Sequence, residues 1–387
     1  MTANSKREPF GQNTEHGLSV ETIRLLGLSL LQKGDWDRAA AQFRLVVALA
    51  PEDTATHNNL GIALRNLGKR EAAIRAFEAA IERKPDYLSA RYNLGTTLGE
   101  LGRSKQALDQ FATIVRLAPE HVDARFALGE MLIETGDQAS AARHLSIYLS
   151  LDPADRFGAA MRLARIGLAP LPPRASVGQI QRLYAKKAAT WDDMPSYLAC
   201  DHVGDRLQQI MAKPSASILD LGCGTGLLGM RLRDQTDQLD GIDMSPSMLA
   251  RAAAKRCYDT LFEGDLLEFL LHSGARYQAI ASAGPLIHFG DLLPVLKAVR
   301  NALAKDALFV CSLYSYDPTD PGGFGLAHHP SLADAGCFAH GSEYVKSAAE
   351  RVGLGLLSCL PVTHEENAEE KIPGLLITSS RHRRTNS

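Results

Sequence analysis

Residues 219–229 read LDLGCGTGLLG, with four glycines in eight positions and an aspartate two residues before the first glycine. Glycine is favoured where a backbone turns sharply or lets a ligand approach closely. After this turn the chain alternates short β-rich runs with helical stretches, which predicts a doubly wound, mostly parallel sheet. Ligands in such folds bind outside the carboxyl ends of the strands, where this glycine cluster falls.

Seven strands are expected after Pro214. Five of them, separated by helical patterns, lie at 217–222, 239–245, 260–265, 277–283 and 308–315. The last two lie near 355–361 and 374–379 and are joined by the polar sequence VTHEENAEEKIP. We expect these two strands to form a hairpin at one edge of the sheet.

The first half of the chain repeats itself every 34 residues. The residues in register are Pro51, Pro85, Pro119 and Pro153; Gly27, Gly61, Gly95 and Gly129; Gly34, Gly68, Gly102 and Gly136; Ala39, Ala73, Ala107 and Ala141; and Phe43, Phe77, Phe111 and Leu145. The first glycine lets two helices approach closely, the second ends the first helix, and the proline closes the second helix. This pattern resembles the tetratricopeptide repeat. We expect copies at about 20–53, 54–87, 88–121 and 122–155, with 156–168 as a covering helix.

Stacked repeats form a solenoid with a concave surface, which favours binding of a protein partner over a role in bulk or dimerisation alone. In tetratricopeptide repeats the first helix of each unit lines this groove. The residues expected there are Arg24, Asn58, Asn59, Tyr92, Asn93 and Phe126. This mixture of polar and aromatic side chains lacks a lysine-rich clamp for a C-terminal carboxylate.

The composition indicates a globular protein, because 45% of its 387 residues are hydrophobic and 22% are charged. A formal net charge of −2 argues against nucleic-acid binding. No stretch approaches the ~18 apolar residues of a membrane-spanning helix. Six cysteines, with no C-x-x-C pair and no zinc-finger spacing, favour a reducing, cytoplasmic location and no metal site.

Changes in composition predict the domain boundaries. We expect a disordered polar N-terminus at 1–19, the repeats with their covering helix at 20–168, and a stiff linker, APLPPRAS, at 169–176. The sheet domain follows at 177–380, and a basic tail containing RHRR occupies 381–387.

Two kinds of ligand suit the glycine-rich turn. The sequence GTGLLG (224–229) matches the dinucleotide pattern G-x-G-x-x-G, with Asp243 about 20 residues further on. The sequence DLGCGTG (220–226) matches acid-x-G-x-G-x-G, the loop of class I S-adenosylmethionine-dependent methyltransferases. Asp220 would repel a pyrophosphate, whereas it would attract the ammonium and sulfonium groups of S-adenosylmethionine by ~1–4 kcal/mol. Leu227 also stands where a dinucleotide loop requires glycine or alanine.

Two further acids end the next strands. Asp243 comes directly after Gly241 and Ile242 near the end of the second run, where a carboxylate can accept hydrogen bonds from both ribose hydroxyls. Asp265 closes the third run in the sequence EGD. Either acid alone could simply cap the following helix. Three acids at three successive strand ends, beside a glycine-rich turn, together favour a ligand site.

The chain resembles bacterial class I S-adenosylmethionine-dependent methyltransferases with N-terminal tetratricopeptide repeats. The resemblance covers nearly the whole chain and rests on DLGCGTGLLGMRLR, LDGIDMSPSMLARAAAKRCYDTLFEGDLLEFL, FGDLLPVLKAVRNAL and CFAHGSEYVKSAAERVGL. It implies an α-solenoid followed by a Rossmann-like domain with a mostly parallel seven-stranded sheet. It also implies that S-adenosylmethionine is the cofactor and that Asp265 lies near its adenine amino group. The cofactor-binding residues it implies are Asp220, Gly222, Cys223, Gly224, Gly226, Asp243, Met244, Asp265, Leu266 and Ser282, with Tyr184 as a cover.

Methyl transfer requires alignment of the acceptor with the methyl group, and a neutral acceptor also needs its proton removed. His288, near the end of the fourth strand, is the first candidate base, and His340 is the second. Either histidine could equally be a packed or surface residue, and Tyr184 and Trp191 could be ordinary core aromatics.

The acceptor side departs from the related pattern. The fourth strand ends in SAGP (282–285) without an acid, His288 stands where tyrosine is common, and LAKDAL lacks the usual glycine turn. No Asn-Pro-Pro-Tyr motif follows, which argues against adenine, cytosine or glutamine as acceptor. Two functions therefore stay open. One is an active methyltransferase whose repeats recruit a protein partner or substrate, and the other is a repeat scaffold that binds the cofactor without transferring its methyl group.

Overall fold

The computed structural model of this chain describes residues 19–194, 197–211, 214–316, 323–327, 332–333, 335–366 and 371–381. The predicted disordered N-terminus, apart from Ser19, and the predicted basic tail after Arg381 lie outside these residues. The chain divides into two compact units, Met1–Leu151 and Asp152–Ser387.

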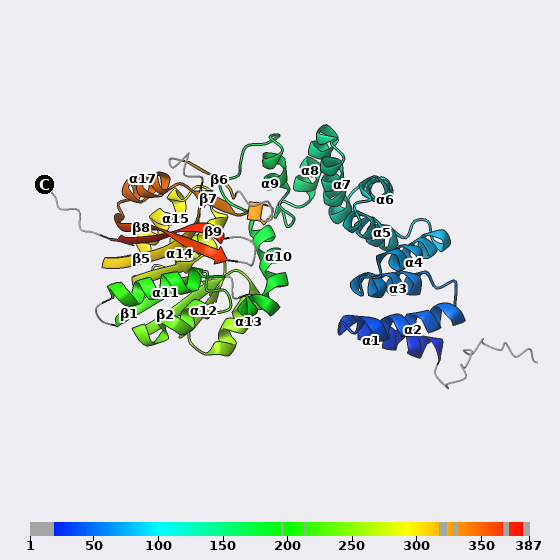
Figure 1. Cartoon of the computed structure of the whole chain (residues 1–387), viewed down its shortest axis with the longest axis horizontal. Helices are drawn as coiled ribbons and strands as arrows, with labels where there is room; N and C mark the ends of the chain where they lie inside the picture. Colours follow the sequence, from blue (N-terminus) through cyan, green and yellow to red (C-terminus); the bar gives the residue numbers. More distant parts are fainter. Residues whose placement is uncertain are drawn as a thin grey trace, which may run out of the picture. The chain divides into compact units, whose positions relative to one another are not determined.

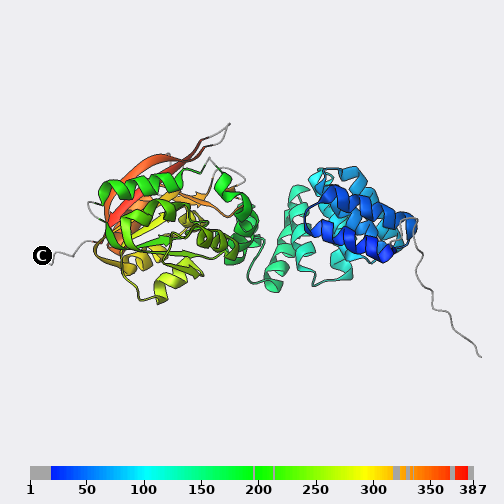
Figure 2. The same cartoon turned by 90° about the horizontal axis from the view of Figure 1, so that it is seen from below.

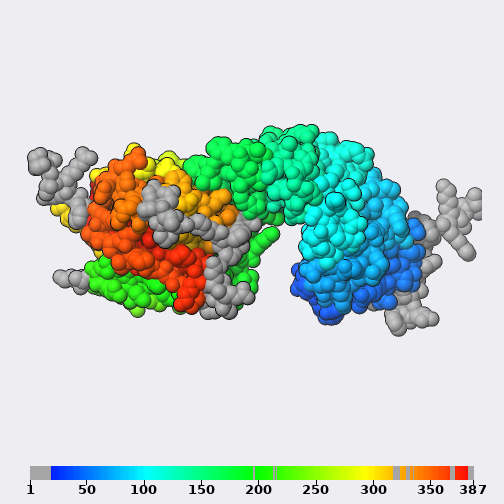
Figure 3. Space-filling view, turned by 45° about the horizontal axis from the view of Figure 1, so that its top comes forward, coloured from blue at the N-terminus to red at the C-terminus, as the bar shows by residue number. Residues whose placement is uncertain are grey.

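The described residues of the first unit form four helical hairpins, which confirms the four predicted repeats. The helices are α1 (Val20–Gln32), α2 (Trp36–Leu49), α3 (Thr54–Asn66), α4 (Arg70–Arg83), α5 (Leu88–Glu100), α6 (Ser104–Leu117), α7 (Val122–Glu134) and α8 (Gln138–Leu151). They follow one another from blue to cyan in chain order (Figure 2). The same gradient is continuous in the space-filling view (Figure 3), as expected where each repeat packs on its neighbours in sequence.

The predicted close approach inside each repeat is confirmed by contacts between a glycine of the first helix and a large side chain of the second. A Cβ built on Gly61 would lie 2.4 Å from the ring of Phe77, and one on Gly129 would lie 2.6 Å from Leu145. Phe77 and Leu145 are fully buried. The glycines that end the first helices, such as Gly34 with φ +76°, adopt the left-handed conformation that glycine favours.

The second unit begins with α9 (Ala159–Arg165), α10 (Val177–Lys187), the 3₁₀ helix η1 (Ala188–Asp193) and α11 (Ala199–Ile210). Strands and helices then alternate as β1 (Ser215–Leu221), α12 (Leu227–Leu232), η2 (Arg233–Gln235), β2 (Thr236–Asp243), α13 (Pro246–Lys255), β3 (Thr260–Glu263), α14 (Leu266–His272), β4 (Tyr277–Ala283), η3 (Pro285–His288), α15 (Leu293–Ala302) and β5 (Leu303–Ser315). The remaining elements are β6 (Phe324–Leu326), β7 (Phe338–His340), α17 (Ser342–Val352), β8 (Gly355–Glu366) and β9 (Lys371–Ser380). Within the described part of the chain, every helix is too short or too polar to cross a membrane.

The sheet has the predicted parallel core and the predicted closing hairpin. Strands β1 to β5 run parallel in the order β3-β2-β1-β4-β5. Figure 1 labels β1, β2 and β5 of this core. Strand β9 pairs antiparallel with β5, and β8 pairs antiparallel with β9, so the hairpin extends the sheet beyond β5. The short pair β6 and β7, which joins the end of β5, is not expected from the sequence because each strand has only three residues.

Helices cover both faces of this sheet. On one face, α11 and α12 contribute Leu207 and Leu228 to a core that includes buried residues of β1, β2, β4 and β5. On the other face, α14, α15 and α17 contribute Leu270, Val299 and Val345 to a larger core. The unit is therefore a three-layer α/β/α fold of the predicted Rossmann-like class, with the carboxyl ends of β1 to β4 at one edge.

The residues before α10 pack within the second unit. The division between the two units lies between residues 151 and 152, whereas the sequence analysis extended the repeat region to residue 168. Met161 of α9 packs with Ala175, Ile180 and Phe338 in a small core. The helix expected to cover the last repeat thus belongs to the unit that contains the sheet.

Candidate functional site

The glycine-rich loop joins β1 to α12 at the carboxyl edge of the sheet. The backbone N–H groups of Gly222 and Cys223 both donate to the carbonyl of Ile242 at 2.9 Å, which ties the loop to the end of β2. A Cβ on Gly222 would lie 2.4 Å from Pro285, whereas a Cβ on Gly224 would meet nothing within 4 Å. The loop is therefore tightly packed on one side and open on the other, where a ligand can reach its backbone.

A cavity lies over this open side and collects all but two of the cofactor-binding residues expected from the sequence, together with the first candidate base. The expected residues that line it are Tyr184, Asp220, Gly222, Cys223, Gly224, Asp243, Met244, Asp265, Leu266 and His288. Gly226 lies at the start of α12, outside the lining, with φ +89°. Ser282 is fully buried in β4, and its hydroxyl donates to the carbonyl of Leu221 at 3.0 Å.

Asp220, which is buried, and Asp243, which is half-buried, are acids on neighbouring strands. One oxygen of Asp220 accepts a hydrogen bond from the Tyr258 hydroxyl at 2.7 Å. The carboxylate of Asp243 accepts from the backbone N–H groups of Gly224 at 3.0 Å and Ser245 at 2.8 Å. Burial raises the pKa of Asp220 to about 7, and Asp243 adds to this effect while the Tyr258 hydroxyl opposes it. Burial also raises the pKa of Asp243 above its usual value, against the effect of its backbone donors.

Asp265 begins α14 and is bound on two sides. Its Oδ1 accepts from the backbone N–H groups of Leu267 at 3.0 Å and Glu268 at 3.2 Å, so it caps the helix as the alternative interpretation expected. It also forms a two-point ion pair with Arg174, at 2.5 Å and 3.3 Å. Asp265 therefore caps a helix and lines the cavity at the same time.

The other side of the cavity, beyond the end of β4, is aromatic. The rings of Tyr184 and Trp191 lie 5.5 Å apart, and those of Trp191 and Tyr197 lie 5.2 Å apart. The Tyr197 hydroxyl donates to the carbonyl of Ala283 at 2.7 Å, which anchors the segment after η1 to the end of β4. Tyr184, Trp191 and Tyr197 all line the cavity.

His288 is buried beside this aromatic group. Its Nδ1 lies 3.2 Å from the carbonyl of Gly336, which can only accept, so Nδ1 carries the proton. Its Nε2 lies 2.9 Å from the Tyr184 hydroxyl and accepts its hydrogen bond. Burial lowers the pKa of His288 to about 4, so the imidazole is neutral at pH 7. His340 does not line the cavity; its Nε2 bonds to the carbonyl of Phe289 at 2.8 Å.

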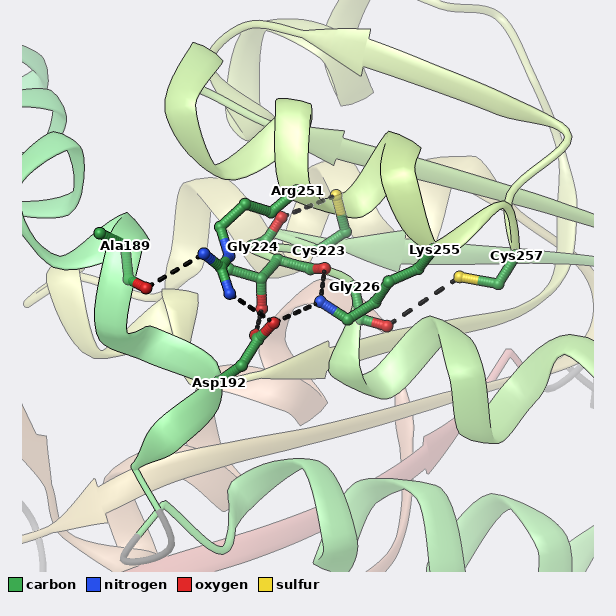
Figure 4. A network of polar contacts seen from close by, with 9 residues as sticks. Ala189, Asp192, Cys223, Gly224, Gly226, Arg251, Lys255 and Cys257 are labelled. Atoms are coloured by element: carbon green, nitrogen blue, oxygen red, sulfur yellow. Dashed lines mark hydrogen bonds and ion pairs between the residues drawn. The ribbon is translucent and has the colours of Figure 1, made fainter.

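An ionic network joins η1 to the glycine-rich loop (Figure 4). The carboxylate of Asp192 accepts from the Thr225 hydroxyl at 2.5 Å, from Arg251 at 3.0 Å and from Lys255 at 2.7 Å. Lys255 also donates to the carbonyl of Thr225 at 2.8 Å, and Arg251 donates to that of Ala189 at 3.0 Å. Burial alone would raise the pKa of Asp192, but these hydrogen bonds lower it to about 2. The network holds η1 against the loop.

Several residues around the cavity were missed by the sequence analysis. They are Arg174, Asp192, Tyr197, Thr225, Arg251, Lys255 and Tyr258. Arg174 lies in the stretch interpreted as a linker, and the others occupy stretches in which no residue pattern distinguishes them from surface or core positions. Each acts through a partner distant in sequence, for which a single sequence offers no local signal.

The residues expected in the groove of the repeats lie on the first helices, α1, α3, α5 and α7. Arg24 forms an ion pair at 2.6 Å within α1. Asn58 is buried, and its side-chain oxygen accepts from Asn93 at 3.0 Å. The rings of Tyr92 and Phe126 each pack on another aromatic ring, at 5.6 Å and 5.4 Å. These contacts hold the side chains in place within and between the first helices.

Two family models match the chain. Residues 218–306 match a model described as a methyltransferase domain. Residues 24–87, 58–98 and 92–156 match a model described as a tetratricopeptide repeat. The two regions correspond to the glycine-rich half of the sheet and to the helical hairpins.

Several characterised methyltransferases are similar to part of the chain. Trans-aconitate 2-methyltransferase of Deinococcus radiodurans is 32% identical over 140 residues, which are 32% of this chain and 54% of the relative. An N,N-dimethyltransferase of Streptomyces fradiae, acting on dTDP-3-amino-3,6-dideoxy-alpha-D-glucopyranose, is 36% identical over 25% of this chain and 38% of its own. The chain thus spans about half or less of the length of these relatives.

Two solved structures are similar to parts of the chain. A methyltransferase of Burkholderia thailandensis, crystallised with 1,6-didemethyltoxoflavin and S-adenosylhomocysteine, is 17% identical and has a TM-score of 0.41 over 52% of this chain and 88% of its own. MamA of Desulfovibrio magneticus is 24% identical and has a TM-score of 0.34 over 35% of this chain and 77% of its own.

Proposed function

We propose that this chain, which carries tetratricopeptide repeats followed by a methyltransferase domain, is an S-adenosylmethionine-dependent methyltransferase. The proposal is carried by one observation. A glycine bend with open space above it is bordered by Asp220, Asp243 and Asp265, which stand at the ends of three neighbouring parallel strands. The methyltransferase activities of the similar proteins support the same reaction class.

The charge of the cavity supports a cationic nucleoside over a dinucleotide. Asp220 is buried and Asp243 is half-buried, and removal from water raises the pKa of both, so their ionised forms are costly in the free protein. A pyrophosphate would add repulsion to this cost. The ammonium and sulfonium groups of S-adenosylmethionine would instead compensate the two carboxylates, by ~1–4 kcal/mol for a pair at short range.

The residues of the chain fit the parts of this cofactor. Gly224 leaves its backbone open to the ligand, and Asp243 retains free lone pairs for two ribose hydroxyls. Asp265, Met244 and Leu266 border the part of the cavity that we assign to the base. Ser282 and Gly226 act indirectly, because they order the strand ends and the start of α12 without lining the cavity.

S-adenosylmethionine supplies an electrophilic methyl group, so the chain has to align an acceptor and manage its proton. Tyr184 and His288 form the pair that we assign to the proton. The imidazole is neutral, and its Nε2 already holds the Tyr184 hydroxyl. A hydroxyl or amine acceptor that bonds to the Tyr184 oxygen can pass a proton through it to Nε2. The aromatic rings of Trp191 and Tyr197 line this side of the cavity.

We also propose that the repeats recruit a protein substrate or partner, through the surface that carries Arg24, Tyr92 and Phe126. Asn58, expected on this surface from the sequence, is buried and contributes instead by accepting the hydrogen bond of Asn93. Tetratricopeptide repeats mediate protein–protein interaction in general, and their stacked first helices form a concave surface. A cytoplasmic location is supported by the six cysteines, all of which are unpaired.

Calorimetry with the full chain tests the cofactor. We expect S-adenosylhomocysteine to bind and NAD not to bind. Asp243→Ala should abolish binding, because it removes the acceptor for the ribose hydroxyls. Asp237→Ala is the matched control, since Asp237 is an exposed acid on the same strand. Binding of NAD in place of S-adenosylhomocysteine would refute the proposal.

One observation favours the second candidate, a scaffold that binds the cofactor without transferring its methyl group. The only lone pair of His288 suited to act as a base is occupied by Tyr184. Labelling of a cell extract with a radioactive methyl donor distinguishes the candidates. A labelled product that depends on the chain supports the enzyme, whereas cofactor binding without any labelled product supports the scaffold.

A further inference from the structure

The sequence predicts a linker at APLPPRAS (169–176), but the structure holds the end of this stretch firmly in the second unit. The carbonyl of Pro173 accepts from the backbone N–H of Gly290 at 2.8 Å, and the N–H of Ala175 donates to the carbonyl of His288 at 2.8 Å. These hydrogen bonds lie on both sides of Arg174. They fix the backbone from which its side chain reaches the cavity.

The side chain of Arg174 is directed at Asp265. Its Nη2 lies 2.5 Å from Oδ2 and its Nη1 lies 3.3 Å from Oδ1, so the guanidinium and carboxylate form a two-point pair. The guanidinium also lies over the ring of Phe289, 5.1 Å from its centroid. The exposed fractions of the two charged side chains are 25% and 11%, and both residues line the cavity.

The ion pair with Arg174 leaves one oxygen of the Asp265 carboxylate, Oδ2, able to accept one more hydrogen bond. Oδ1 accepts from Arg174 and from the backbone N–H groups of Leu267 and Glu268. Among the residues that the structure describes, Oδ2 accepts a hydrogen bond from Arg174 alone. A carboxylate oxygen has two lone pairs, so Oδ2 keeps one position for a donor on a ligand. Because Arg174 prevents the carboxylate from rotating, that position is fixed in space.

We propose that Arg174 is a positioning residue that makes the site selective for a purine with an exocyclic amino group. It fixes Asp265 so that Oδ2 accepts a hydrogen bond from the 6-amino group of adenine and repels a 6-carbonyl. The inference rests on the proposed function, which assigns the base of the cofactor to this part of the cavity. A residue of the supposed linker thereby contributes to recognition of the cofactor.

Calorimetry with two ligands tests this role in the full chain. The ligands are S-adenosylhomocysteine and S-inosylhomocysteine, which differ at position 6 of the base. We expect the unmodified protein to prefer the adenosyl ligand by roughly 10- to 100-fold, as for a buried acceptor that loses its donor. Arg174→Met should reduce this preference to a few-fold, because the freed carboxylate can rotate away from the carbonyl.

The chain offers a matched control in Arg182. This arginine also lies over a phenylalanine ring, that of Phe157 at 4.1 Å, but it is exposed and does not line the cavity. Arg182→Met should leave the preference unchanged. A second variant, Asp265→Asn, should abolish the preference: the backbone donors on Oδ1 hold the amide oxygen there, and the amino group then at the Oδ2 position loses the hydrogen bond from Arg174 and offers the ligand a donor in place of an acceptor.

The outcomes separate this inference from the proposed function. If Arg174→Met lowers the binding affinity of both ligands by the same factor, Arg174 has only a structural role and the inference is overturned. An unchanged preference in Asp265→Asn would overturn it as well. If the unmodified protein binds neither ligand, the proposed cofactor itself is wrong. Circular dichroism of each variant distinguishes loss of selectivity from loss of folding.

Discussion

We expect the substitution Asp220→Asn to stabilise the ligand-free protein above pH 7 and to weaken its affinity for S-adenosylmethionine. Asp220 is buried in β1, and burial raises its pKa to about 7, from an ordinary value of 3.8. Between pH 3.8 and about pH 7, Asp220 is therefore protonated in the folded protein and ionised in the unfolded chain. The stability of the protein consequently falls as the pH rises from about 4 to about 7, and this loss is complete above the folded-state pKa.

The size of the effect follows from the two pKa values. One pH unit corresponds to ~1.4 kcal/mol for one proton, so a change from 3.8 to about 7 sets an upper limit on the order of 4 kcal/mol. Asparagine does not titrate, and its side-chain oxygen can still accept from the Tyr258 hydroxyl. About two of these pH units lie above pH 5, so the variant should exceed the unmodified protein by roughly 1–3 kcal/mol at pH 8 relative to pH 5.

Urea unfolding at pH 5 and pH 8 measures this difference. Trp191 reports on the second unit once the other tryptophan, Trp36, is replaced by phenylalanine. Asp237→Asn is the control, since Asp237 is an exposed acid on β2. Calorimetry in two buffers of different ionisation enthalpy then measures the protons released on cofactor binding near pH 6.5, where a bound cation favours the ionised form of Asp220.

A parallel loss of stability in the unmodified protein and in Asp220→Asn would contradict this reasoning. It would mean that Asp220 does not change its protonation between pH 5 and pH 8. Equal affinity of the two proteins for S-adenosylmethionine at pH 8 would remove the charge argument for the cofactor as well. A lower stability of Asp220→Asn at both pH values would indicate a packing defect instead.

Three further predictions concern the repeats, η1 and the buried imidazole. Gly61→Ala should destabilise the repeats by ~1–3 kcal/mol, because its Cβ would overlap the ring of Phe77. Gly99→Ala should stabilise them by up to ~1 kcal/mol, because its Cβ would lie 3.6 Å from the Met131 sulfur, which is an ordinary contact. Urea unfolding measures both changes. Asp192→Asn should speed dissociation of S-adenosylhomocysteine roughly 10-fold in stopped-flow measurements, because the variant loses the charged hydrogen bonds from Arg251 and Lys255. Asp193→Asn is the control, since Asp193 is exposed, and equal dissociation rates in the two variants would count against a role for the network. Nitrogen NMR should show His288 neutral, with its proton on Nδ1, from pH 5 to pH 8, since its pKa is about 4; a titration near pH 6.5 would contradict this.

The repeats and the parallel sheet could be predicted because their signals are local. A period of 34 residues places a glycine opposite a large side chain in every hairpin, as Gly61 and Phe77 show. The alternation of runs and helices predicts the seven principal strands in nearly the observed positions. The strands β6 and β7 escaped prediction because three residues are too few to establish a pattern.

The same locality explains which parts of the site could be predicted. Asp220 and Asp243 follow short apolar runs that predict strands. Neighbouring parallel strands have their carboxyl ends at the same edge of the sheet, so the two acids must lie close together there. Their positions therefore follow from the sequence alone, together with the glycine bend beside them. Their protonation does not, because the pKa of Asp220 depends on the helices that cover the sheet and on Tyr258.

Tertiary structure alone decided how these residues are held. Arg174 meets Asp265 across 91 positions of sequence, and Asp192 meets Lys255 across 63. Tyr184 and His288, 104 positions apart, share one hydrogen bond that fixes the imidazole in a single neutral form. The neighbours of a residue in the sequence determine whether it lies in a helix or a strand and on which face of that helix or strand its side chain stands. The ionic and hydrogen-bonding partner of that side chain is chosen only when distant elements pack together and exclude water.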